Sequence, residues 1–129
     1  MTDKSALNRV KMSDIRSGET RKIGIAGWEL YITVNYFEND QPGEVFVSVG
    51  KNGTTVSGLM QTIAIQFSML LQAGVPCERI SDNMKHHKFE PRDEKFHSLI
   101  DALASTVLES CSDRGSQINL DHSLKEVQW

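Results

Sequence analysis

Hydrophobic and polar positions alternate strictly along residues 28–37. One side carries only apolar and aromatic residues, namely Trp28, Leu30, Ile32, Val34 and Tyr36. A period of two with β-branched and aromatic residues predicts a β-strand with a buried face. Residues 20–26 and 44–49 are shorter predicted strands, and a polar turn over 38–43 precedes the third. Short turns between successive strands predict an antiparallel three-stranded meander.

After residue 55 the apolar period changes to three and four. It predicts an amphipathic helix of about five turns that ends before Gly74, on a face made by Val56, Leu59, Met60, Ile63, Phe67, Leu70 and Leu71. A short helix is predicted over 76–85, and a third over 93–109 whose apolar face begins with Phe96. Strands followed by helices predict an α+β fold, with a small antiparallel three-stranded sheet and about three helices packed on one face.

The 129 residues are enough for one domain. We expect a flexible leader over 1–19, the α+β domain over 20–111 and a polar tail over 112–129. Residues 1–26 carry six cations and three acids, whereas the rest of the chain carries eight cations and fourteen acids. The leader is therefore either a solvated basic segment or an arm that touches a phosphate or an acidic partner.

The overall composition excludes several classes of protein. A net charge of −3 argues against DNA binding driven by charge, and we expect no sequence-specific DNA binding. No apolar run approaches the length of a membrane span, and no secretory signal is visible at the N-terminus. Two cysteines, Cys77 and Cys111, do not make a disulfide framework. These features predict a cytoplasmic protein.

A glycine-bearing turn, 50–55, joins the third predicted strand to the long helix. Free backbone amides at a helix N-terminus attract anions, and a lysine adds a positive charge. The turn predicts a phosphate or nucleotide site made of Lys51, Asn52, Gly53, Thr54 and Thr55. Its spacing differs from a Walker A loop. The alternative is a plain strand-to-helix turn capped by a threonine.

A second cluster, 85–92, mixes basic and aromatic residues. Lys88 and Arg92 would add contacts to a nucleotide; the alternative is a polar loop that Phe89 anchors in the core. His86 and His87 are adjacent and diverge on any regular element, so we expect no metal site. We predict no catalytic residue, because neither cysteine has an assignable histidine and carboxylate partner.

Several short motifs follow one another in a fixed order: Lys22–Gly27, Tyr31–Val34, Gly43–Val47, Gly50–Thr54, Ser57–Met60, Leu70–Pro76 and Lys88–Pro91. Together they resemble a known module, the TSCPD domain found toward the C-terminus of adenosylcobalamin-dependent (class II) ribonucleotide reductases. The resemblance covers about residues 20–92, with a weaker continuation to 109. Lys88 stands where the family has arginine, and Arg92 and Asp93 replace small residues.

The resemblance implies descent from, or partnership with, a reductase. Such enzymes work through a thiyl radical inside a large α/β barrel, which this chain is too short to hold. Adenosylcobalamin is therefore implied only for the family, and we expect no cofactor on this chain alone.

Three functions remain open. In the first, the chain is an accessory or split subunit that partners a reductase large chain in deoxyribonucleotide synthesis. Alternatively it is a stand-alone protein that binds or sequesters a nucleotide, as would suit a phage. Lastly, it is an oligomerisation domain that pairs with its own copies through Tyr31, Phe37 and Phe46 on the second sheet face.

Overall fold

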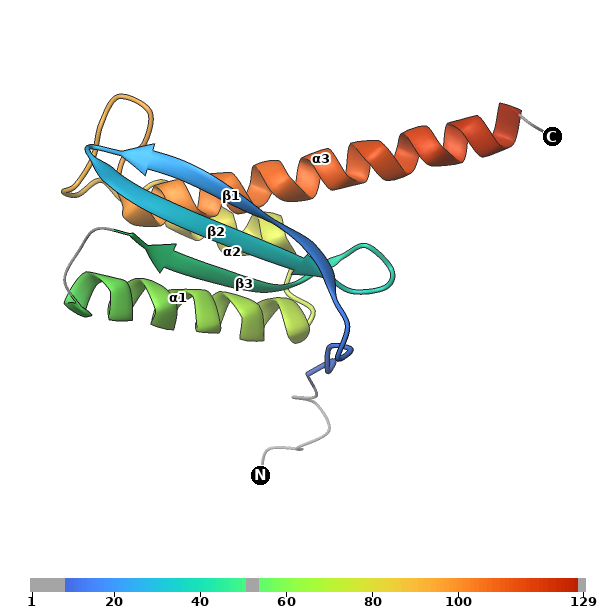
Figure 1. Ribbon diagram of the computed structural model, residues 1–129, viewed down its shortest axis with the longest axis horizontal. Helices are drawn as coiled ribbons and strands as arrows, with labels where there is room; N and C mark the ends of the chain where they lie inside the picture. The colour runs from blue at the N-terminus through green and yellow to red at the C-terminus, as the bar shows by residue number, and fades with distance from the viewer. Residues whose placement is uncertain (1–8, 51–53, 128–129) are drawn as a thin grey trace.

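Three strands precede three helices along the chain (Figure 1). The computed structural model describes residues 9–50 and 54–127, with Thr54 and residues 116–127 described as backbone. The elements are β1 (Ser17–Ile25), β2 (Trp28–Tyr36), β3 (Pro42–Val49), α1 (Thr54–Gln72), α2 (Cys77–Lys85) and α3 (Leu99–Val127). This order confirms the predicted α+β fold.

The sheet has the order β1-β2-β3 and both strand pairs are antiparallel. Leu30 of the central strand lies opposite Ile23 of β1 and Val49 of β3. The turn between β1 and β2 places Ala26 and Gly27 at φ 48 and 83, a region that glycine enters at little cost. The predicted alternation in β2 is confirmed, since its apolar side is buried or half-buried.

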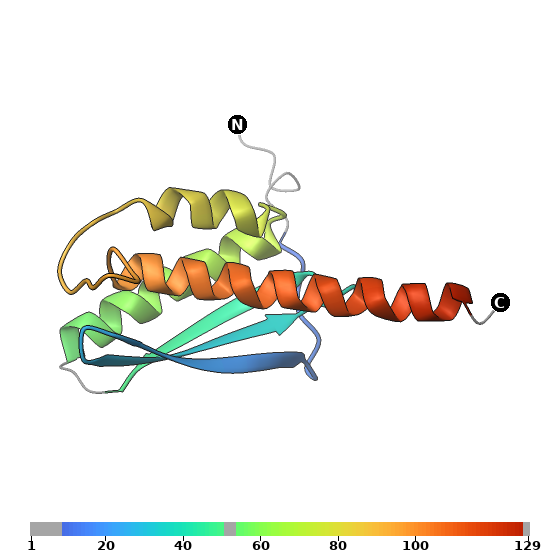
Figure 2. The ribbon, with the colours of Figure 1, turned by 90° about the horizontal axis from the view of Figure 1, so that it is seen from above.

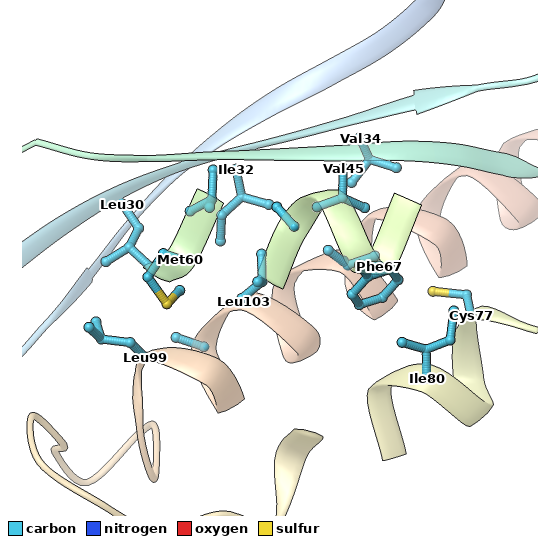
Figure 3. Close-up of a cluster of buried hydrophobic side chains, with 14 of the residues drawn as sticks. Leu30, Ile32, Val34, Val45, Met60, Phe67, Cys77, Ile80, Leu99 and Leu103 are labelled. Carbon is cyan, nitrogen blue, oxygen red and sulfur yellow. The ribbon is translucent and has the colours of Figure 1, made fainter. Parts of the chain in front are cut away.

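All three helices lie on one side of the sheet (Figure 2). α1 packs along β3, α3 packs across β1 and β2, and α2 packs on α3. Phe67 of α1 is almost fully buried, and Figure 3 shows it between Val45 of β3 and Cys77 and Ile80 of α2. The core therefore contains side chains from every layer.

α1 also closes the free edge of β3. Ser68 Oγ accepts a hydrogen bond from the Val45 N–H at 2.8 Å and lies 3.1 Å from the Val45 carbonyl oxygen. Gln72 Nε2 donates to the Gly43 carbonyl at 2.9 Å. Unpaired backbone groups along an edge strand invite pairing with other chains. Here two helix side chains satisfy backbone groups of Gly43 and Val45 that a fourth strand would otherwise pair.

The third helix begins later than the sequence predicts and continues further. It starts at Leu99 rather than 93 and runs to Val127. The Asp93 carboxylate accepts hydrogen bonds from the N–H groups of Lys95 and Phe96 at 2.9 Å each, so the segment forms a turn. Ser98 then caps the helix by accepting from the Asp101 N–H at 3.0 Å.

Residues 9–16 of the predicted leader pack on the domain; residues 1–8 lie outside the described residues. The Val10 N–H donates to the Gln72 carbonyl at 2.9 Å, and the Met12 side chain is buried. Arg16 pairs with Glu44, and Arg21 of β1 pairs with Asp113 at 2.7 Å. These two cations of the basic N-terminal region therefore form ion pairs with acidic residues of the same chain.

The edge contact gives a first prediction. Replacement of Ser68 by alanine removes the group that satisfies the Val45 N–H, and we expect a loss of about 1–3 kcal/mol in the free energy of unfolding. Urea denaturation followed by circular dichroism measures this loss. Ser112→Ala is the matched control, because Ser112 is an exposed helical serine and the variant should stay within about 0.5 kcal/mol of wild type. Equal effects of the two variants would contradict the bridging role of Ser68.

Asp93 gives a pH-dependent prediction. The hydrogen bond from the Phe96 N–H is the largest of the effects that lower its pKa, and the Ala26 N–H adds a second. Because the pKa of Asp93 is lower in the folded state, its carboxylate stabilises the fold at pH values above its unfolded-state pKa of about 4. This stabilisation is lost as the pH falls through the pKa of the folded state. Asp93→Asn should therefore lower Tm at pH 7 and have a shrinking effect in acid. Thermal melts of the wild type and of Asp93→Asn, from pH 7 down into acid, test this prediction, with Glu94→Gln as the control. A difference in Tm between the two proteins that does not change with pH would contradict it.

Candidate functional site

A groove of about 1280 Å³ opens at the end of the molecule where β2 and β3 are joined. Four segments form its walls: the N-terminal segment 10–17, the turn 36–42, the α1–α2 connection 71–78, and α3 near residues 111–115. They are distant in the sequence, and Figure 1 shows them meeting at the end opposite the β1–β2 turn.

Two ion pairs hold the groove walls in place. Arg16 donates to both carboxylate oxygens of Glu44 at 2.8 and 2.7 Å, and Asn35 Nδ2 donates to the same carboxylate at 2.7 Å. This charge-assisted contact, made by the single nitrogen Nη1, links the N-terminal segment to β3. Across the groove, Arg114 of α3 donates to Asp40 Oδ1 at 2.7 and 3.0 Å. Asp40 sits in the β2–β3 turn at φ 65, a conformation that aspartate tolerates.

The groove ends on a buried polar side chain. The Arg114 guanidinium carbon lies 4.2 Å from the centre of the Tyr36 ring, at cation–π distance. The Tyr36 hydroxyl forms a 2.7 Å hydrogen bond with Ser110 Oγ, which in turn donates to Glu19 at 2.6 Å. Burial raises the pKa of Tyr36 to about 12. The phenol is therefore neutral at physiological pH.

Two thiols meet beside this tyrosine. Cys77, the first residue of α2, and Cys111 of α3 have their sulfur atoms 3.6 Å apart. The hydrogen bond between them and burial raise the pKa of Cys77, whereas the same bond lowers the pKa of Cys111. Of the pair, Cys111 is the group that forms a thiolate more readily.

The sequence pattern does not predict this pair of thiols. The sequence assigned no partner to either thiol. The two cysteines are 34 positions apart in the sequence and belong to different helices. Whether the two thiols meet depends on how α2 packs on α3.

The described residues of the predicted nucleotide site lie at the other end of the molecule. Lys51, Asn52 and Gly53 lie outside the described residues, and Thr54 and Thr55 begin α1. The loop that carries Lys88 and Arg92 lies near the β1–β2 turn at this same end (Figure 1).

The described residues of this predicted site make few contacts. The Lys88 side chain is exposed, and Arg92 Nε lies 3.0 Å from Glu90 Oε1. Phe89, which the alternative interpretation anchors in the core, is 43% exposed, whereas Phe96 of the same loop is buried. The nucleotide site stays a prediction.

Among the described residues, no three histidine, cysteine or acidic side chains gather in a geometry that could hold a metal ion. In this same part of the chain, no helix combines the length and the apolar character needed to cross a membrane.

Comparison with known proteins gives relatives that share one name. The chain is 37% identical over 99 residues to a vitamin B12-dependent ribonucleotide reductase of Rhodopirellula baltica, an alignment that covers 77% of this chain and 10% of the reductase. It is 36% identical over 83 residues to the enzymes of that name from Streptantibioticus cattleyicolor and Streptomyces coelicolor, covering 64% of this chain and 14% and 9% of theirs. No solved structure gives a significant match.

The chain spans about a tenth of the length of the curated relatives it matches. The matching family model is the TSCPD domain, and it extends over residues 8–110. These residues include the three strands, α1, α2 and the first part of α3. The chain therefore belongs to the TSCPD domain family and is related to the corresponding region of class II ribonucleotide reductases.

Proposed function

We propose that this chain is an accessory module that docks on the large chain of a vitamin B12-dependent ribonucleotide reductase, is not catalytic alone, and acts in deoxyribonucleotide synthesis. The relatives carry a similar segment as a small part of one long chain. The observation that carries the proposal is the outer face of α1.

α1 has no charged side chain in its 19 residues. Four large apolar side chains on it are exposed, with Leu59 at 61%, Ile65 at 57%, and Met69 and Leu70 above 40%. A surface helix of a globular protein ordinarily turns charged residues to solvent. We refer to these four exposed side chains as the α1 outer face.

The charge-free character of this face favours a protein partner. Burial of a charged group costs free energy unless it is paired, and the α1 outer face imposes no such cost. Exposed apolar patches on soluble proteins mark interaction sites. The occupant that we propose is the reductase chain, because in the long relatives a domain of this family is covalently joined to the rest of the enzyme.

Charge introduced on the α1 outer face should abolish docking. We expect the double variant Leu59→Glu/Leu70→Glu to weaken binding to the class II reductase of the same organism by at least about 100-fold, because docking would bury two unpaired charges. Isothermal titration calorimetry measures the affinity. Asn83→Glu, an exposed position on α2, is the matched control and should bind like wild type.

Two results would overturn the proposal. One is wild-type protein that does not bind the reductase at micromolar concentrations. The other is a wild-type homodimer in sedimentation that the double variant dissociates, which would assign the α1 outer face to a second copy of the chain. Unaltered thermal unfolding of the variants shows that a loss of binding is not a loss of folding.

A further inference from the structure

The two thiols of the groove lie close enough to react with each other. Their sulfur atoms are 3.6 Å apart, whereas the bond in a disulfide is about 2.05 Å long. Each sulfur moves when its side chain rotates about χ1, so rotation can bring them together. The two cysteines come from α2 and α3, which pack directly on one another. The packing of the two helices therefore holds the two thiols in direct contact.

The two thiols differ in access to solvent. Cys77 is buried, with 5% of its surface exposed, whereas Cys111 is half-buried. Both line the groove, which is open to solvent. A small molecule that enters the groove can therefore reach Cys111 first.

The thiols also differ in nucleophilic character. Thiolates, and not thiols, attack disulfides. The hydrogen bond with Cys77 lowers the pKa of Cys111, and the Tyr36 hydroxyl has the same effect. The contact raises the pKa of Cys77. Solvent access and the tendency to form a thiolate therefore both favour Cys111 as the attacking group.

We propose that Cys77 and Cys111 form a reversible oxidation site, which closes to an intramolecular disulfide by exchange with a small-molecule disulfide. The Cys111 thiolate attacks one sulfur of the small disulfide and expels the other as a thiolate. Cys77 then loses its proton to solvent and attacks Cys111 Sγ, which expels the second small thiol. Two protein thiols are oxidised, and one small disulfide is reduced to two thiols.

The cross-link would join the start of α2 to the middle of α3. It closes a loop over the 34 positions that separate the two cysteines, and loop closure stabilises the folded state mainly by restricting the unfolded chain. The α1–α2 connection, which forms one wall of the groove, would then be fixed on α3. This inference does not depend on docking to a reductase.

The test uses the native full-length chain and oxidised glutathione as the probe. After incubation at pH 8, we expect titratable thiols to fall from two to zero per chain, and the intact mass to fall by two hydrogen atoms. Tm should rise by roughly 10 °C, and dithiothreitol should reverse all three changes.

Single variants test the assigned order of attack. Cys77→Ser retains Cys111 and should accumulate one glutathione adduct. Cys111→Ser retains the buried Cys77 and should react at least about ten-fold more slowly, as expected for a thiol that is buried and poorly accessible. Circular dichroism establishes that each variant is folded; the mass measurement on wild type needs no variant.

Two outcomes would overturn the inference. Native wild-type protein could keep both thiols under conditions in which the urea-unfolded chain is oxidised. Alternatively, it could end as a glutathione adduct that never resolves to the internal disulfide.

Discussion

Burial of one face of the three-stranded sheet is the constraint on which the rest of the structure depends. A sheet this small is not stable alone and needs helices on its apolar face. α1 covers β3, and α3 covers β1 and β2. α2 packs on α3 rather than on the sheet. Its first residue, Cys77, therefore lies against Cys111. The thiol contact is thus a consequence of how the sheet is covered.

The sequence predicts the elements well where local periodicity decides them. The alternation in β2 and the spacing in α1 identify both elements. On α1, however, the predicted apolar face is wrong at Leu59 and Leu70, which are exposed, whereas Met60, Phe67 and Leu71 are buried. The third helix is misplaced at its start because Phe96 fits the helical period, while the Asp93 carboxylate holds the backbone in a turn. Side-chain hydrogen bonds of this kind compete with the helix and leave no trace in the apolar pattern.

The groove illustrates what periodicity cannot supply. Arg16 and Glu44 lie 28 positions apart, and Asp40 and Arg114 lie 74 apart. Only the packed fold brings them together. The candidate nucleotide residues were chosen from local chemistry alone, and among them Lys51, Asn52 and Gly53 lie outside the described residues. The relation to class II reductases, by contrast, followed from the order of short motifs, which survives without knowledge of tertiary contacts.

The closure of β3 by Ser68 and Gln72 limits how copies of this domain can assemble. With one side of the sheet sealed, β1 is the remaining edge. Two copies that paired through β1 would form a continuous six-stranded sheet related by a two-fold axis. Both ends of that sheet would again be β3, so no third copy could be added. Pairing through β1 would therefore stop at two copies rather than extend as a growing sheet.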